Sequence, residues 1–494
     1  MSARLLSFFA FLIAGLFVSA QITTDPALPV ATKKVTITFD SSKESRLGYH
    51  TGELYAHTGV IIEGKTEWQH VIGTWGNNSV QPKLTNKGSG IYEFEISPDI
   101  KQFYTVAAGE KVQKVALVFR SADGTKQTND LFINVYTEGL VVDISTPANN
   151  SMVAKNQSIS ISATASENST QKLFIGETLL TQNTGTSISA NYTFPESGNY
   201  LVIAEASAGG KTVRDTARIF VRGDVVSEQK PANYKKGINY PSANSAALVL
   251  WAPKKEFVYV LGDFNNWQPD NNFLMKKDGD FFWLEINNLE PGKEYVFQYF
   301  IDGKIKIADP YTEKISDPWN DQYIPETVYP GLIAYPTGKT EGIASVLQPG
   351  QQEYSWEIAN FQAPAKEKLV IYELLVRDFM TEHSYTAVIE KLDYLEDLRV
   401  NVLELMPVNE FEGNSSWGYN PSFYFAPDKY YGPKNDLKKL IDECHKRGIA
   451  VVIDMVLNHS YGQSPFVQMY MDNWTITADN PWYNQKSNFQ NTSL

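Results

Sequence analysis

Three segments near the C-terminal end of the chain place side chains capable of chemistry next to stretches whose pattern indicates strands. Asp454 ends the apolar run Ile449–Asp454, His459 follows it closely, and Tyr419 lies in the segment WGYNP at 417–421. A carboxylate orients its neighbours by hydrogen bonding, and an imidazole both binds hydroxyl groups and stabilises nearby charge. An aromatic ring adds a flat apolar face.

Strands and helices alternate around these segments, and this order determines where their side chains meet. Residues 368–379 and 401–408 are two further apolar runs, which we expect to be strands buried on both faces, like 449–454. Two amphipathic helices separate the strands; their apolar faces are Val388, Leu392, Leu395 and Leu398, and then Leu437, Leu440, Ile441 and Cys444 before a glycine cap at Gly448. The order predicts parallel βαβ units, so the side chains that follow the strands gather at one edge of the sheet.

A β-rich region earlier in the chain contains another aromatic candidate, Trp267. The run VYVLGDFNNW at 258–267 predicts a strand that leads into a turn closed by the tryptophan. Two interpretations of Trp267 remain open at this point. Its indole face is a platform for a sugar ring, or the side chain packs in the core and closes the turn.

Motifs in both regions resemble known families. Residues 258–267 and the segment QYFIDG at 298–303 resemble the carbohydrate module that precedes the catalytic barrel of isoamylases, pullulanases and branching enzymes, and also the glycogen-binding module of the AMP-activated kinase β subunit. The segments IYELLVRDF at 371–379, WGYNP at 417–421 and DMVLNH at 454–459 resemble, in that order, the α-amylase superfamily of glycoside hydrolases. The second resemblance implies a (β/α)8 barrel, in which active sites lie at the C-terminal ends of the strands.

This resemblance implies roles for individual residues. Tyr419 would stack beneath the sugar at the cleavage subsite, His459 would hydrogen-bond the hydroxyl groups of that sugar, and Asp454 would orient the site. Asn458 matches a residue that in some members ligates a structural calcium, and an amide oxygen is a suitable ligand for that cation. The alternative for Tyr419 and His459 is packing at the strand ends.

The carboxylates that would do the chemistry are not expected in this chain. Retaining glycosidases need a nucleophile and an acid/base carboxylate about 5 Å apart. In the superfamily these follow the fourth and fifth strands, whereas Leu494 lies just beyond the third predicted strand. We therefore expect residues 367–494 to be the N-terminal part of a barrel, and the chain to be an inactive fragment of a longer enzyme.

Three β-sandwich modules are expected before the barrel, so the predicted fold is multidomain. The first is a possible starch-binding module that contains Tyr55, Trp68 and Trp75. These three aromatic residues either bind starch or pack in an aromatic core. The second, with short strands separated by polar turns, is expected to be immunoglobulin-like, and the third is the isoamylase-type module. Their expected boundaries are 33–137, 138–223 and 237–330.

The N-terminal twenty residues have the pattern of a signal peptide. Arg4 supplies the basic region, residues 5–18 are apolar, and VSA at 18–20 provides small residues for cleavage. The apolar run is shorter than the ~20 residues that a membrane span needs. We therefore expect a secreted protein, extracellular or periplasmic, without a membrane anchor.

Composition narrows the possible partners. The 494 residues include 43 Lys and Arg against 56 Asp and Glu, which gives a formal net charge of −13. So acidic a chain is a poor partner for nucleic acid or anionic lipid, because both are polyanions. The family resemblance implies a hydrolase that acts on α-glucans such as starch, glycogen or maltooligosaccharides by a retaining mechanism. A debranching or branching enzyme of the same superfamily and a non-catalytic glycan-binding protein are the alternatives.

Overall fold

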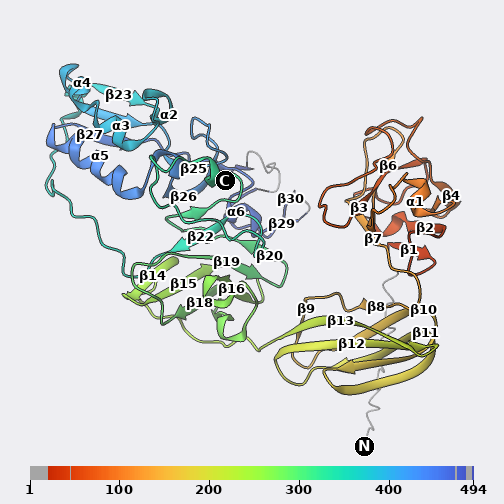
Figure 1. Cartoon of the computed structure of the whole chain (residues 1–494). Helices are drawn as coiled ribbons and strands as arrows, with labels where there is room; N and C mark the ends of the chain where they lie inside the picture. The colour runs from red at the N-terminus through yellow and green to blue at the C-terminus, as the bar shows by residue number, and fades with distance from the viewer. Residues whose placement is uncertain (1–20, 45, 473–474, 485–491, 494) are drawn as a thin grey trace, which may run out of the picture. The chain divides into compact units, whose positions relative to one another are not determined.

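The computed structural model describes residues 21–44, 46–472, 475–484 and 492–493, and the predicted signal peptide lies outside them (Figure 1). The chain divides near residue 222 into two compact units. No helix within the described residues has both the length and the apolar character needed to cross a bilayer.

The first unit begins with a module of two antiparallel sheets. One sheet has the order β1-β2-β5-β4 and the other the order β3-β6-β7. The strands are β1 Ile22–Asp25, β2 Val35–Asp40, β3 Leu54–Ile62, β4 Thr85–Gly88, β5 Ile91–Ile96, β6 Val112–Ser121 and β7 Leu131–Asn134, with helix α1 at Ile100–Phe103. Alternate residues of β2 and β5 are buried in a shared core, which is the period-two pattern of the sequence.

The second module, which the sequence analysis expects to be immunoglobulin-like, consists of antiparallel strands. Its strands are β8 Val142–Thr146, β9 Ser151–Ala154, β10 Ser158–Ile175, β11 Thr178–Thr193, β12 Gly198–Ala208 and β13 Lys211–Arg222, and hydrogen bonds connect all six into one sheet. Strand β10 is continuous but contains an irregularity between Thr164 and Ser169. Before the irregularity β10 pairs with β8, and after it with β12.

The second unit opens with the module predicted at 237–330. Its two sheets have the orders β14-β15-β18-β17 and β16-β19-β22-β21, with β20 beside β19. The strands are β14 Gly237–Ser242, β15 Ser245–Trp251, β16 Val258–Gly262, β17 Lys276–Asp278, β18 Phe281–Ile286, β19 Tyr295–Ile301, β20 Ile305–Ile307, β21 Ile315–Ser316 and β22 Ala344–Leu347. Strand β22 pairs with β19 and lies beyond the expected boundary at 330, so the module includes part of the predicted connector.

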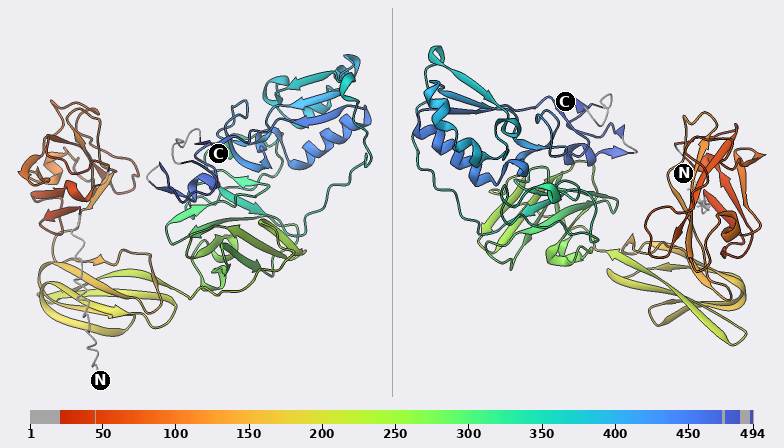
Figure 2. Two further views of the ribbon diagram at one scale, coloured as in Figure 1. Left: turned by 180° about the vertical axis from the view of Figure 1, so that it is seen from behind. Right: turned by 45° about the horizontal axis from the view of Figure 1, so that its top comes forward.

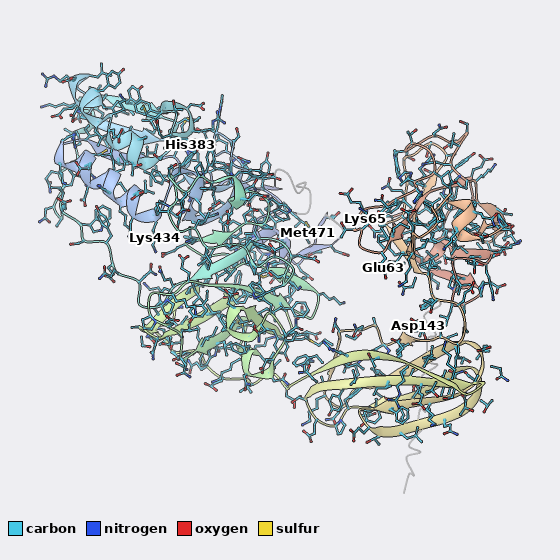
Figure 3. The ribbon with its side chains drawn as sticks, viewed as in Figure 1. Glu63, Lys65, Asp143, His383, Lys434 and Met471 are labelled. Carbon is cyan, nitrogen blue, oxygen red and sulfur yellow. The ribbon has the colours of Figure 1, made fainter. Side chains whose placement is uncertain are left out.

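The barrel-like region contains the predicted parallel sheet, in the order β23-β24-β27 (Figure 2). The main elements are β23 Ile371–Leu374, α2 Val376–Phe379, α3 Tyr385–Ile389, α4 Leu392–Asp397, β24 Val402–Leu405, β25 Asn409–Phe411, β26 Pro421–Pro427, α5 Lys434–Lys446 and β27 Ala450–Ile453. Helix α5 begins at Lys434, which Figure 3 labels, and Cys444 is buried on its inner face. Shorter elements follow: β28 His459–Ser460, α6 Pro465–Gln468, β29 Met471–Asp472, β30 Thr475–Ile476 and β31 Thr492–Ser493.

Four expectations for this region were wrong in detail. The run 368–379 is a short strand followed by α2, and the first predicted helix is divided into α3 and α4. Leu398, assigned to the apolar face, is 47% exposed because it lies just beyond the end of α4. Val452 and Ile453 of β27 are also exposed, because the elements described here cover the sheet only partly.

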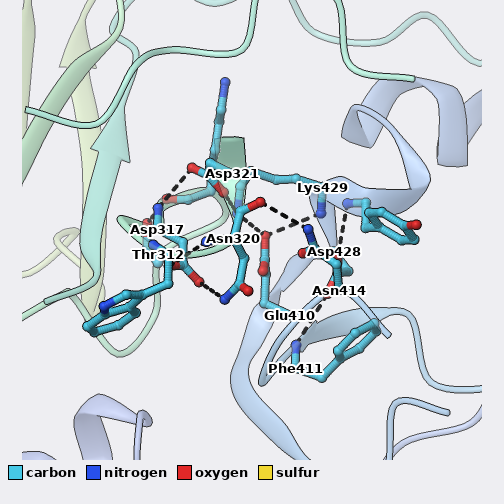
Figure 4. Close-up of polar contacts among 12 residues, drawn as sticks. Thr312, Asp317, Asn320, Asp321, Glu410, Phe411, Asn414, Asp428 and Lys429 are labelled. Atoms are coloured by element: carbon cyan, nitrogen blue, oxygen red, sulfur yellow. Dashed lines mark hydrogen bonds and ion pairs between the residues drawn. The ribbon is translucent and has the colours of Figure 1, made fainter. Parts of the chain in front are cut away.

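A buried ion cluster connects the isoamylase-type module, predicted at 237–330, to the barrel-like region, predicted at 367–494 (Figure 4). The Lys429 ammonium lies 2.6 Å from Glu410 Oε1 and 3.1 Å from Asp321 Oδ1, and all three side chains are less than 10% exposed. Asp321 begins the short helix η4 Asp321–Tyr323 of the module, whereas Lys429 begins η6 Lys429–Tyr431 and Glu410 lies in β25. Burial alone would lower the pKa of Lys429, but the surrounding carboxylates outweigh burial and raise it.

Candidate functional site

The candidate site lies where β24 and β27 end. Asp454 directly follows β27, and its backbone N–H donates to the Leu405 carbonyl at 2.9 Å, which continues the parallel ladder by one residue. The loop of residues 412–420, which connects β25 and β26, reaches the same edge. The family resemblance, together with the predicted strand order, implied this meeting point, because active sites of (β/α)8 barrels lie at the C-terminal ends of the strands.

Hydrogen bonds connect the three predicted substrate-binding residues. The Tyr419 hydroxyl donates to Asp454 Oδ2 at 2.7 Å. The Nε2 atom of His459 lies 2.8 Å from the Tyr419 carbonyl oxygen, which can only accept, so Nε2 carries the proton. The structure therefore brings Tyr419, His459 and Asp454 together. Their contact with a sugar stays a prediction.

A glycine holds Tyr419 in place. Gly418 has φ +88°, a left-handed conformation that side-chain-bearing residues rarely adopt. A Cβ atom at this position would lie 2.4 Å from the carbonyl oxygen of Pro407 and 2.7 Å from its Cβ. The Gly418 N–H also donates to Ser416 Oγ at 3.0 Å. Only glycine allows so close a passage of the loop over Pro407.

The base of the loop is closed by hydrogen bonds between its two ends. The Glu412 N–H donates to the Asn420 carbonyl at 3.3 Å, and the Asn420 side-chain amide donates to the Glu412 carbonyl at 3.1 Å. The next residue, Pro421, accepts from the Tyr461 N–H at 2.9 Å. The segment that carries His459 is thus attached to the end of the loop that carries Tyr419.

The site combines exposed aromatic surface with negative charge. Trp417 is 61% exposed and Tyr419 39% exposed, so both rings are accessible from solvent. The hydrogen bond to Asp454, partial burial and the charges of Asp454, Glu373 and Glu404 raise the pKa of Tyr419 to about 12. The phenol is therefore protonated at neutral pH and donates a hydrogen bond.

Glu373 and Glu404 are residues that the sequence analysis missed. They occupy paired register positions on β23 and β24. The signal in the sequence was a single acidic residue within each of the two apolar strands. The sequence does not give the register between the strands, so the two carboxylates could not be assigned to the same face of the sheet. In the structure both carboxylates are close enough to influence Tyr419.

Trp267 does not form a sugar platform. Its side chain is only 3% exposed, and its indole Nε1 donates to Asp263 Oδ1 at 3.0 Å. The other oxygen of Asp263 accepts from the Val296 N–H at 2.8 Å, which joins the turn to β19. Of the two interpretations left open, the structure supports packing and turn closure, because a buried indole presents no face to a ligand.

The structure adds no carboxylate partner for the calcium ligand suggested at Asn458. Asn458 is exposed at the strand end, and the described residues contain no group of three or more His, Cys, Asp or Glu side chains that could hold a metal ion. Calcium binding by Asn458 remains a prediction from the family resemblance.

Family models match two parts of the chain. Residues 383–492 match the alpha amylase catalytic domain, and residues 235–319 match carbohydrate-binding module 48, the isoamylase N-terminal domain. The resemblance to the α-amylase superfamily and to isoamylase-type N-terminal modules is therefore confirmed.

Similar curated proteins include enzymes of two kinds. A malto-oligosyltrehalose trehalohydrolase of Saccharolobus solfataricus is 31% identical over 186 residues, which are 38% of this chain and 28% of that protein. Its Mycobacterium tuberculosis counterpart is 37% identical over 134 residues, 27% of this chain and 23% of that protein. A 1,4-alpha-glucan branching enzyme of Pseudoalteromonas atlantica is 29% identical over 238 residues, 45% of this chain and 30% of that protein. The chain thus spans less than a third of the length of each relative.

Solved structures show a weaker likeness. A pullulanase of Paenibacillus barengoltzii in complex with maltotetraose has a TM-score of 0.40 and is 20% identical, with 53% of this chain and 44% of that chain covered. A putative alpha amylase of Salmonella typhimurium has a TM-score of 0.39 and is 24% identical, with 53% of this chain and 39% of that chain covered.

The contact between Tyr419 and Asp454 can be tested by titration. In Asp454→Asn we expect the pKa of Tyr419 to fall from about 12 toward the usual value for tyrosine, because the substitution removes the negative charge that favours the protonated phenol. Carbon-13 NMR of labelled tyrosine would measure the pKa, with Tyr419→Phe to identify the resonance. An unchanged pKa in Asp454→Asn would show that the hydrogen bond does not form in solution.

Proposed function

We propose that the chain belongs to a secreted α-amylase-family glycoside hydrolase that acts on α-glucans by a retaining mechanism. The observation that carries this proposal is the group Tyr419, Asp454 and His459 at the C-terminal edge of a parallel sheet. The family-model match over 383–492 supports the same conclusion. The signal-peptide pattern of residues 1–20 supports secretion.

Each of the three residues has a physical task in binding a glucose unit. The exposed Tyr419 ring stacks against the apolar face of the sugar, while its hydroxyl, held by Asp454, fixes the orientation of the ring. His459 is attached to the Tyr419 backbone, and its ring edge lies beside the sugar hydroxyl groups. A retaining mechanism further needs two carboxylates about 5 Å apart, and we assign neither role to a described residue.

The nature of the glucan reaction distinguishes this proposal from its alternatives. The similar proteins include a 1,4-alpha-glucan branching enzyme and malto-oligosyltrehalose trehalohydrolases, so a branching or debranching enzyme of the same superfamily is the first alternative. A non-catalytic glycan-binding protein is the second alternative. Analysis of the products that a chain carrying both catalytic carboxylates forms from soluble starch separates the cases: hydrolysis releases reducing ends, branching changes linkages without releasing them, and binding does neither.

The binding role of Tyr419 is directly testable. In Tyr419→Ala we expect the affinity of the chain for maltoheptaose to fall about tenfold, because one aromatic stacking contact contributes roughly 1–3 kcal/mol. Isothermal titration calorimetry would measure the dissociation constant. The matched control is Tyr394→Ala, which removes a tyrosine that is 51% exposed on α4. Equal affinity in Tyr419→Ala and Tyr394→Ala would contradict the proposed function.

We also propose that the first module binds α-glucan through a separate aromatic surface. Trp75 and Phe132 are each 49% exposed, and Trp68 and His57 are half-buried between them. The His57 ring stacks on Trp68 with centroids 5.6 Å apart and meets Trp75 edge-on at 5.1 Å. Of the aromatic residues named from the sequence, Tyr55 is buried, so Trp68 and Trp75 form the accessible part.

A buried chain of hydrogen bonds determines which ring nitrogen of His57 carries the proton at this surface. Arg120, which can only donate, donates from Nε and Nη2 to Gln81 Oε1 at 2.8 and 2.6 Å. The Gln81 amide nitrogen therefore donates to His57 Nδ1 at 2.7 Å, and the ring proton of neutral His57 lies on Nε2. Burial and the charge of Arg120 lower the pKa of His57, which keeps the ring neutral. The surface thus combines two indoles with an N–H donor, which suits a sugar.

Retention on immobilised amylose tests this second site. Trp75→Ala should elute earlier than the unsubstituted chain, since it loses one stacking face worth roughly 1–3 kcal/mol. Tyr49→Ala, which removes a 63% exposed ring elsewhere in the same module, should elute unchanged. If Trp75→Ala is retained as strongly as Tyr49→Ala, the aromatic surface does not bind glucan.

A further inference from the structure

Trp319 is an exposed tryptophan of the isoamylase-type module that neither the sequence motifs nor the candidate site includes. It lies in the turn of residues 317–321, between β21 and η4, and is 51% exposed. We propose that Trp319 is an additional glucan subsite, which the module contributes to the binding surface of Tyr419 and Trp417. This inference rests on the proposed function, because it takes the ligand to be an α-glucan chain.

Two carboxylates hold the 317–321 turn in a defined shape. Asp317 accepts from the Trp319 N–H at 2.7 Å and from the Asn320 side-chain amide at 2.8 Å. Asp321 Oδ2 in turn accepts from the Asp317 N–H at 2.8 Å. Because these hydrogen bonds already order the turn that carries Trp319, little backbone freedom remains to be lost when a ligand binds.

The same turn is attached to the loop that carries the candidate site. The Asn414 side-chain amide donates to the Asn320 carbonyl at 2.9 Å, directly beside Trp319. Asp321 uses its remaining oxygen, Oδ1, for the buried ion pair with Lys429. Asn414 lies within the 412–420 loop, three residues before Trp417. One hydrogen bond thus joins the turn that carries Trp319 to the 412–420 loop, and the ion pair of Asp321 joins the same turn to Lys429 (Figure 4).

The indole of Trp319 has the properties of a binding surface and not of a core residue. No ring or cation contact to it occurs among the described residues, and its Nε1–H has no hydrogen-bond acceptor there. Trp267, by contrast, is buried and hydrogen-bonded within the same module. An exposed indole with a free N–H can stack on a pyranose ring and donate to one of its hydroxyl groups.

A linear α-glucan is the ligand that fits this arrangement. Trp319, Trp417 and Tyr419 are exposed aromatic residues on two segments that contact each other, and repeated glucose units present repeated apolar faces. On this proposal, an oligosaccharide that contacts both Tyr419 and Trp319 must be longer than one that covers Tyr419 alone. The contribution of Trp319 should therefore depend on chain length, unlike that of Tyr419.

The test compares maltoheptaose with maltotriose by calorimetry, using the full chain with Trp75→Ala to suppress binding by the first module. Adding Trp319→Ala should weaken maltoheptaose binding about fivefold or more and leave maltotriose binding unchanged. The matched control is Trp356→Ala, which removes a 44% exposed tryptophan of the connector and should change neither affinity.

Two results would overturn the inference in distinguishable ways. If Tyr419→Ala weakens binding of both oligosaccharides but Trp319→Ala weakens neither, the proposed function stands and the Trp319 subsite is wrong. If Trp319→Ala weakens both oligosaccharides equally, it acts by disturbing the site and not as an extension of it. Absence of binding by the Trp75→Ala chain would overturn the proposed function and the subsite together.

Discussion

The buried ammonium of Lys429 is the constraint on which the second unit depends. It bridges Glu410 of the barrel-like region and Asp321 of the module, away from water. Removing one partner of such a cluster leaves an uncompensated buried charge, at a cost of about 3–5 kcal/mol. The two parts therefore form a shared structure around Lys429, and the 412–420 loop that carries Tyr419 starts from this cluster.

Exposure separates the aromatic residues that can bind ligand from those that build the fold. Trp267 belongs to the motif with the strongest resemblance to a sugar-binding module, yet it closes a turn inside the core. Trp319 belongs to no recognised motif and is exposed on a turn that one hydrogen bond joins to the 412–420 loop. Sequence patterns identify a module, but the accessible face of a ring depends on what packs around it.

Local patterns predicted the elements well and the long-range contacts poorly. The parallel order β23-β24-β27 followed from apolar runs and strand order, and the meeting of Tyr419 with Asp454 followed from the family resemblance. The Lys429 cluster was unpredictable because its members are 19 and 108 residues from Lys429 and look like ordinary surface charges in the sequence. The continuous β10 was also missed, because its polar residues at the irregularity resemble a turn.

Hydrogen exchange in the 412–420 loop tests most directly whether the buried cluster holds the site. In Lys429→Met the loop amides should exchange faster than in the unsubstituted chain, because unpaired Glu410 and Asp321 must move toward water. In Lys434→Met the loop should exchange at the original rate, since that lysine pairs with Glu313 near the surface, where ion pairs contribute about 0–1 kcal/mol. Unchanged exchange of the loop in Lys429→Met would contradict the account.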